Sequence, residues 1–132
     1  MAGSRETASN CDGPLSLEQR ILLVEDEPTT REILTSVLRQ EGHAVDSVAT
    51  AGAADTCMKS IAYAVVISDW FLPDGNGGDV ADAAMNAGAK TLIISDFDIE
   101  LPEAIGSRHE LLSKRLGPSA LLAAVQRAMN PK

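Results

Sequence analysis

The sequence predicts an α/β protein in which helices cover both faces of a parallel sheet. Five short aliphatic runs alternate along the chain with segments whose apolar residues recur at helical spacing. Most of these runs are almost free of polar positions, as in strands that are buried on both faces. With 132 residues, the chain is long enough for one domain with a real core and too short for two.

Each strand has its own signal in the sequence. Ile21–Val24 is an aliphatic run, and Val65–Ile67 is a β-branched run that precedes a turn-rich segment. Val45–Val48 carries Asp46 and is therefore expected at an edge of the sheet. The five strands are expected at 21–24, 45–48, 64–68, 91–94 and 110–113.

The helices are predicted from apolar stripes and from the residues that flank them. Pro28 suits the first turn of the first helix, and Gly42 stops it. Thr50 is a candidate N-cap for the second helix, Gly88 closes the third, and Pro118 begins the last. The stripes are Ile33, Leu34, Val37 and Leu38; Ala54, Cys57, Met58 and Ile61; Val80, Ala81, Ala84 and Met85; and Leu121, Leu122, Val125, Ala128 and Met129.

The alternation of elements fits a doubly wound, flavodoxin-like five-stranded parallel sheet with strand order 2-1-3-4-5 and right-handed crossovers. Acidic residues crowd the stretch 96–109, and Pro102 and Gly106 interrupt it, so the fourth helix is expected to be short or disordered. Residues 1–17 are expected to form a flexible N-terminal extension, and residues 18–130 a single domain.

The composition narrows the range of functions. A formal net charge of −8 would repel duplex DNA, so no direct nucleic-acid binding is expected. The first 16 residues lack the apolar stretch of a signal peptide, and the longest apolar run, Ile61–Ile67, is too short to span a bilayer. Cys11 and Cys57 are expected to be reduced thiols. These features predict a cytoplasmic protein without membrane contact.

Polar side chains follow four of the predicted strands. Glu25 and Asp26 follow the first, Asp69 the third, Ser95 the fourth and Lys114 the fifth. In this topology the four strand ends lie beside one another, at the edge where doubly wound sheets bind ligands. Three carboxylates in one place repel one another unless a cation resides there, and oxygen ligands without His or Cys favour Mg²⁺. The opposing hydroxyl and ammonium would suit an incoming phosphoryl oxygen.

This arrangement predicts phosphoryl chemistry. Asp69 would attack phosphorus as a carboxylate nucleophile, while Mg²⁺ and Lys114 neutralise charge on the transferring group. Each residue taken alone also has a structural interpretation. Asp69 can cap a turn, and Glu25 and Asp26 can begin a helix. Ser95 can be an ordinary strand-end hydroxyl, and Lys114 a surface lysine.

Two motifs carry a family resemblance that covers residues 20–129. They are Leu-Leu-Val-Glu-Asp-Glu-Pro at 22–28 and Ser-Asp-Trp-Phe-Leu-Pro-Asp-Gly at 68–75. With these motifs the sequence resembles the receiver domain of bacterial two-component response regulators, in particular the chemotaxis-type receivers. The resemblance implies the roles of six residues: Asp69 as phospho-acceptor, Asp26 as a direct Mg²⁺ ligand, Glu25 as a ligand through water, the backbone carbonyl of Phe71 as a further ligand, Ser95 as the switch hydroxyl, and Lys114 as the cation that pairs with phosphate.

The resemblance implies a switch rather than an enzyme, one that at most phosphorylates itself and slowly loses the phosphoryl group. Its partners would be a sensor histidine kinase or a histidine phosphotransfer protein and a downstream protein target, with a homodimer as a further possibility. Because the chain ends soon after its last helix, the readout is expected to be protein contact rather than DNA binding.

The chain departs from the family pattern around the last two strands. Arg115 follows Lys114 where the family usually has proline, Asp96 follows Ser95 where it has a small residue, and Leu111 stands at the aromatic switch position. We therefore expect an atypical signalling face, with activation read through the ordering of residues 96–109.

Two other functions remain open. One is a receiver-like scaffold that takes no phosphate and acts only by binding, which Asp96 and the Lys-Arg turn favour. The other is a Mg²⁺-dependent phosphatase of the haloacid-dehalogenase kind, which would need an aspartate where Phe71 stands. His43 and His109 have no nucleophile or ligand set beside them in the sequence and are assigned no role.

Overall fold

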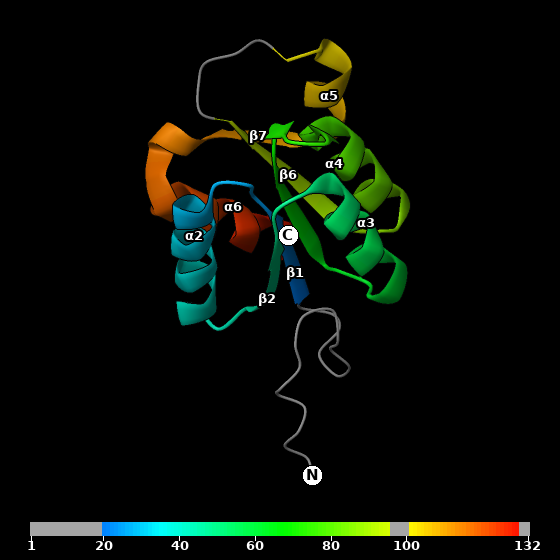
Figure 1. Ribbon diagram of the computed structural model, residues 1–132. Coiled ribbons are helices and arrows are strands. Elements are labelled where there is room, and N and C mark those ends of the chain that lie inside the picture. Colours follow the sequence, from blue (N-terminus) through cyan, green and yellow to red (C-terminus); the bar gives the residue numbers. More distant parts are fainter. Residues whose placement is uncertain (1–19, 96–100, 130–132) are drawn as a thin grey trace.

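The fold is a five-stranded parallel sheet covered by helices on both faces (Figure 1). The computed structural model describes residues 20–95 and 101–129. Its strands lie in the order β2-β1-β3-β6-β7, which is the predicted order 2-1-3-4-5 when the five sheet strands are counted along the chain. The expected extension at 1–17 lies outside the described residues, as do residues 96–100.

The elements follow the expected alternation, with one small addition after Asp69. The sheet contains β1 (Arg20–Val24), β2 (Ala44–Val48), β3 (Val65–Asp69), β6 (Lys90–Ser95) and β7 (Glu110–Ser113). The helices are α2 (Pro28–Gln40), α3 (Ala51–Ser60), α4 (Gly77–Asn86), α5 (Glu103–Arg108) and α6 (Gly117–Met129), and Lys114–Leu116 form a 3-10 turn. The addition is a two-stranded hairpin, β4 (Phe71–Leu72) with β5 (Gly75–Asn76), within the stretch read from the sequence as a turn.

The predicted helix boundaries are confirmed by their local chemistry. Pro28 is the first residue of α2, and the Thr50 hydroxyl accepts a hydrogen bond from Ala53 N at the start of α3. Gly42 and Gly88 have φ angles of 93° and 98°, the left-handed conformation that ends helices and that other residues rarely adopt. The fourth helix is short, as expected, with the six residues of α5.

Alternate side chains of the central strands enter two separate apolar cores. Ile21 and Leu23 of β1 pack toward α2 and α6, whereas Leu22 and Val24 pack toward α3 and α4. Leu38, Leu121 and Val125 complete the first core, and Ala54, Val80 and Ala84 complete the second. Because each fully buried aliphatic side chain contributes about 1.5–3 kcal/mol, these cores hold the strand ends at defined positions.

Three expectations about single residues are wrong. Ile33 and Met85 were placed on buried helical stripes, but they are 49% and 38% exposed because α2 and α4 present neighbouring positions to the sheet. On α2 the buried residues are Thr35 and Leu38. Cys57 was expected to be a reduced thiol, but it is disulfide-bonded. The expectation was wrong because it rested on cellular compartment and not on the distance between two cysteines. Cys11 lies outside the described residues.

No helix within 20–95 or 101–129 combines the length and the apolar character needed to cross a membrane.

Asp46, which predicted an edge strand, is buried in the edge strand β2. Its carboxylate accepts hydrogen bonds from Arg20 Nε and a terminal guanidinium nitrogen, at 3.1 and 3.0 Å, and from the Tyr63 hydroxyl at 2.7 Å. Burial and the neighbouring Asp46 carboxylate raise the pKa of Tyr63 well above its ordinary value, so the phenol keeps the proton that it donates. The three side chains therefore join β1, β2 and the loop before β3.

Replacement of Asp46 by alanine is expected to lower the free energy of unfolding by about 3 kcal/mol, because it leaves the Arg20 guanidinium and the Tyr63 hydroxyl without their acceptor. Urea unfolding followed by circular dichroism measures the change. The control is Asp55→Ala, which removes an exposed ion pair with Lys59 and should change stability by less than about 0.5 kcal/mol. Equal effects of the two substitutions would contradict the structural role of Asp46.

Candidate functional site: an acidic cluster beside a lysine

The end of β1 presents two acids of very different exposure. Glu25 is completely buried, whereas Asp26 is exposed. The loop that carries them is fixed by Arg31 of α2, whose guanidinium donates to the carbonyl oxygen of Glu25 at 2.9 Å and lies 3.4 Å from that of Asp26. Glu27, the third acid of the run, caps α2 by accepting a hydrogen bond from Thr30 N at 2.7 Å. That hydrogen bond lowers the pKa of Glu27.

Asp69 ends β3 beside the β1 pair. It is 6% exposed, and its strand is hydrogen-bonded to β1 on one side and to β6 on the other. The loop after it turns back tightly, with Gly77 N donating to the carbonyl oxygen of Trp70 at 2.8 Å. A Cβ atom at Gly77 would lie 2.3 Å from the carbonyl oxygen of Asp69, so this close approach requires glycine.

Lys114 joins the acids from the end of β7. Its Nζ atom lies 2.8 Å from Oε1 of Glu25 and 3.3 Å from Oδ2 of Asp69. The contact with Asp69 has the geometry of a hydrogen bond. The contact with Glu25 is an ion pair, and the angles at Oε1 do not meet those of a hydrogen bond. One ammonium group therefore lies between two carboxylates that come from separate strands.

The three carboxylates form a cluster with the chemistry of a divalent-cation site. Glu25, Asp26 and Asp69 each offer an oxygen, and these atoms all lie within 4.8 Å of one another. The donors are hard oxygens, which suit Mg²⁺ or Ca²⁺ better than a softer transition metal. The buried Oε1 of Glu25, which has no aligned donor, also fits a site completed by a cation or its bound water.

The cluster changes the proton affinity of Asp69. Burial and the neighbouring Glu25 charge raise the pKa of Asp69 to about 6, although Lys114 acts in the opposite direction. Burial also disfavours the charged form of Lys114, but its contacts with Glu25 and Asp69 outweigh this and raise the pKa of the ammonium. At neutral pH the site therefore holds an ionised lysine and a carboxylate that ionises less readily than an exposed aspartate.

A cleft of about 390 Å³ opens over the cluster. Phe71 lines it together with Glu25, Asp26, Asp69 and Lys114, so the structure brings five of the six predicted site residues together. Pro73 also lines the cleft, and Asp74, which follows it, ties this loop to the start of α3 by accepting hydrogen bonds from Ala51 N and Gly52 N, at 2.8 and 2.9 Å.

Ser95 is the predicted site residue that does not line this cleft. It ends β6 at the same edge of the sheet, half-buried and paired in register with Ser113 of β7. Asp96, the acid expected to disturb the site, lies outside the described residues. The unusual Lys114-Arg115 sequence forms the 3-10 turn, in which the Ser113 hydroxyl accepts a hydrogen bond from Arg115 N at 3.1 Å.

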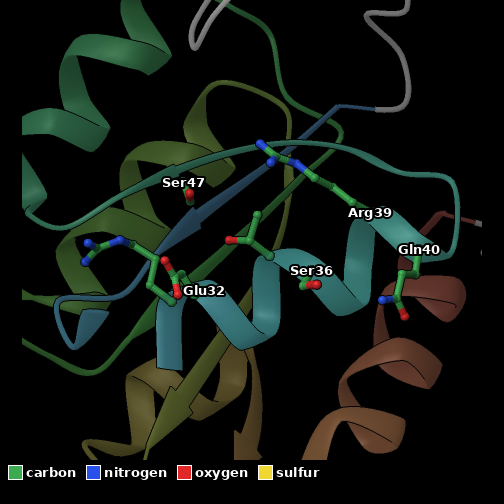
Figure 2. Close-up of a pocket in the computed structure, with 7 residues that line it drawn as sticks. Glu32, Ser36, Arg39, Gln40 and Ser47 are labelled. Atoms are coloured by element: carbon green, nitrogen blue, oxygen red, sulfur yellow. The ribbon is translucent and has the colours of Figure 1, made fainter. Parts of the chain in front are cut away.

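A second hollow lies away from the acids. It is a groove of about 490 Å³ between α2 and β2, where Ser47 faces the row of α2 side chains that includes Glu32, Ser36 and Arg39 (Figure 2). The cations of this groove have structural partners: Arg39 donates to the carbonyl oxygen of Val45 at 2.8 Å, and Arg31 donates to that of Glu25. The arginines therefore satisfy backbone carbonyl groups beside the edge strand.

His109, which was assigned no role from the sequence, has two polar partners. It is buried, with Nε2 2.7 Å from Oδ1 of Asp82 and Nδ1 2.5 Å from Oγ1 of Thr91. The partners lie 27 and 18 residues away in the chain, so local spacing contained no signal for this cluster.

The topology and the cluster together define a doubly wound α/β domain with an acidic site at the carboxyl edge of its sheet. Residues 21–126 match the family profile described as the response regulator receiver domain. The chain belongs to this family.

Curated relatives support the assignment over different lengths. The DNA-binding response regulator MtrA of Mycolicibacterium smegmatis is 31% identical over 116 residues, which are 84% of this chain and 50% of that protein. The transcriptional regulatory protein PmrA of Pectobacterium parmentieri is 41% identical over 58 residues, which are 44% of this chain and 26% of that protein. The chain thus spans half or less of the length of these relatives.

Solved structures share the fold. The response regulator TrrA of Thermotoga maritima, in complex with Mg²⁺ and BeF, superposes with a TM-score of 0.76 at 26% identity, covering 83% of this chain and 98% of that one. A CheY-like receiver domain from Methylobacillus flagellatus gives a TM-score of 0.75 at 23% identity, covering 83% and 98%.

The raised pKa of Asp69 predicts a specific pH dependence of stability. The ordinary pKa is 3.8 and the folded value about 6, so between these values the folded protein holds a proton that the unfolded chain has lost. In the presence of a chelator, stability should therefore fall as the pH rises from about 4 to 7, by up to about 3 kcal/mol.

The matched variant is Asp69→Asn, which cannot ionise and should not show this component of the pH dependence. Denaturant unfolding of the two proteins at several pH values measures the difference. If the difference in free energy of unfolding between the wild type and Asp69→Asn stays constant between pH 4 and 7, the pKa of Asp69 is not raised.

Proposed function

We propose that this chain is a phospho-accepting receiver, with Asp69 as acceptor, and that it signals by protein contact. The observation that carries the proposal is the position of the Lys114 ammonium, 2.8 Å from Glu25 and 3.3 Å from Asp69, inside a cluster of three carboxylates. A buried nucleophile, a candidate cation site and a fixed positive charge are the parts that phosphoryl transfer to a carboxylate needs.

In the proposed reaction, a carboxylate oxygen of Asp69 attacks the phosphorus atom of a phosphohistidine. The new oxygen–phosphorus bond forms as the nitrogen–phosphorus bond breaks, and the bond electrons leave with the imidazole, which takes up a proton. Lys114 would move from its contact with Asp69 to a phosphoryl oxygen, so its charge stays paired. Ser95, at the neighbouring strand end, would donate a hydrogen bond to another phosphoryl oxygen.

Glu25, Asp26, Asp69 and the carbonyl oxygen of Phe71 are the groups proposed to hold Mg²⁺, with Glu25 acting through water. The ion would supply positive charge that offsets the repulsion between the carboxylates and the phosphoryl oxygens. Arg31 would support this site indirectly, because it holds the backbone that carries Glu25 and Asp26.

The proposed partners follow from this chemistry. A sensor histidine kinase or a histidine phosphotransfer protein would supply the phosphoryl group in the cytoplasm, and a protein target or a second copy of the chain would receive the signal. The net charge of −8 supports protein contact rather than direct binding to nucleic acid. MtrA, the relative matched over 116 residues, is a DNA-binding regulator, and the match covers 50% of its length.

The scaffold function remains the second candidate because one observation favours it. Lys114 already pairs with both Glu25 and Asp69, and an ammonium held between two carboxylates can stabilise the site without any phosphate. The phosphatase function has no support from the cleft, because Phe71 offers no side-chain acid there.

Incubation with beryllofluoride and Mg²⁺, or with acetyl phosphate and Mg²⁺, is expected to give a one-to-one adduct at Asp69. Fluorine NMR and intact-protein mass spectrometry measure the two adducts. Asp69→Asn should abolish both, while Asp79→Asn, an exposed position on α4, should leave both intact. A wild-type protein that forms no adduct dependent on Asp69 would favour the scaffold function.

Removal of the exposed ligand tests the metal site separately. Asp26→Asn should weaken Mg²⁺ binding by at least about tenfold, because it removes one full negative charge from the oxygen cluster. Isothermal titration calorimetry, or the fluorescence of the single tryptophan next to Asp69, reports the affinity. Glu32→Gln changes an exposed acid of α2 that lines the separate groove beside β2, and it serves as the control. Equal affinities for both variants would place the ion elsewhere.

A further inference from the structure

The groove of about 490 Å³ between α2 and β2 is built from polar side chains. Glu32, Thr35, Ser36 and Arg39 recur along one side of α2 at helical spacing, and Ser47 faces them from β2 (Figure 2). All seven described residues that line the groove are polar or charged. Its volume is in the range of small-molecule sites, and its lining suits a hydrophilic ligand.

Thr35 brings an unpaired hydroxyl to the floor of this groove. The residue is 8% exposed, and its Oγ1 is buried without a hydrogen-bond partner in the described part of the chain. A threonine hydroxyl inside a helix commonly bonds to the carbonyl oxygen one turn earlier, which this one does not. Because a buried unpaired hydroxyl is unfavourable, a ligand oxygen small enough to reach the floor would be stabilised there.

Two arginines make the groove locally positive in an acidic chain. Arg31 and Arg39 line it with a single acid, Glu32, whereas the whole chain has a net charge of −8. The Arg39 guanidinium is fixed by one terminal nitrogen, which donates to the carbonyl oxygen of Val45 at 2.8 Å, two residues from Ser47 on β2. A guanidinium has five N–H donors, so the remaining ones can bind a phosphate group. Because the side chain is already held in place, binding costs it less conformational freedom.

The other end of the groove carries an acid. Glu32 precedes Arg39 by seven residues, which places it about 10 Å away along the axis of α2. A carboxylate accepts hydrogen bonds and repels a second anionic group, so hydroxyl groups are the ligand groups that suit this end. Ser36, between the two, can donate to such a hydroxyl or accept from it. The groove therefore matches a molecule with one phosphate group and several hydroxyl groups.

We propose that the groove between α2 and β2 binds a small phosphorylated polyol of the sugar-phosphate class. Its phosphate group contacts Arg39, Thr35 and Ser47, and its hydroxyl groups contact Glu32 and Ser36. A nucleotide fits less well, because bases commonly stack on aromatic side chains and the lining has none. The groove shares no lining residue with the cleft over the acidic cluster, so the proposal does not depend on phosphoryl transfer.

Isothermal titration calorimetry of the full chain, in the presence of a chelator, tests this site with four probes: glucose 6-phosphate, inorganic phosphate, glucose and adenosine monophosphate. Glucose 6-phosphate should bind one-to-one and at least about tenfold more tightly than each of the other three, because it alone suits both ends of the groove. Nitrogen-15 NMR locates the site: the backbone amide signals of Thr35, Ser36 and Ser47 should shift on binding.

Two substitutions each remove one part of the site. Thr35→Val keeps the shape of the side chain and should weaken glucose 6-phosphate binding about tenfold, whereas urea unfolding should show no loss of stability, since the hydroxyl has no partner to lose. Arg39→Gln should weaken binding by more than about tenfold, because it removes the charge that pairs with the phosphate group. The control is Lys59→Gln, which removes the same charge from an exposed position on α3 and should bind like the wild type.

Several results would overturn the proposal. Equal affinities for glucose 6-phosphate and inorganic phosphate would make the groove a simple anion site, and tighter binding of adenosine monophosphate would make it a nucleotide site. Amide shifts confined to Asp69 and Lys114 would place the phosphate in the other cleft. The proposal also fails if glucose 6-phosphate does not bind at millimolar concentration, or if Thr35→Val and Arg39→Gln bind it as tightly as Lys59→Gln does.

Discussion

The contact of one ammonium group with two carboxylates is the interaction on which the site depends. The sheet brings Glu25 and Asp69 together at the ends of adjacent strands, and both are buried. Burial, and then repulsion from Glu25, raise the pKa of Asp69, and Lys114 opposes both effects from the end of β7. The same charge that stabilises the cluster is available to a transferred phosphoryl group, so the arrangement serves both the fold and the proposed chemistry.

The rest of the molecule divides into a rigid sheet and a lightly held periphery. The central strands are packed on both faces by aliphatic side chains, which fixes the strand ends to which the acids and the lysine belong. The short helix α5 has one buried apolar residue, and Arg108 and His109 at its end form hydrogen bonds with Asp82 of α4. Solved receivers with 23–26% identity to this chain share its fold.

The errors of the sequence analysis have physical causes. Ile33 and Met85 fit an apolar stripe, but a stripe does not reveal the rotation of a helix, which depends on the shape of the sheet below it. The hairpin β4–β5 was read as a turn, because two-residue strands have no periodicity to detect. His109 had no ligand set in the sequence, since Asp82 and Thr91 reach it only after three elements have packed together.

The sequence by itself determined the alternation of strands and helices, the strand order and the convergence of Glu25, Asp26, Asp69 and Lys114, because aliphatic runs specify buried strands and parallel strands end at one edge. It also contained the helix signals at Pro28, Thr50, Gly42 and Gly88. Only the tertiary structure decided that Lys114 lies between two acids, that Asp46 is buried with Arg20 and Tyr63, and that α5 is seated on Gly78 and Asp82. These features depend on distances between side chains that are remote in the chain, and such distances exist only once the two faces of the sheet have been packed.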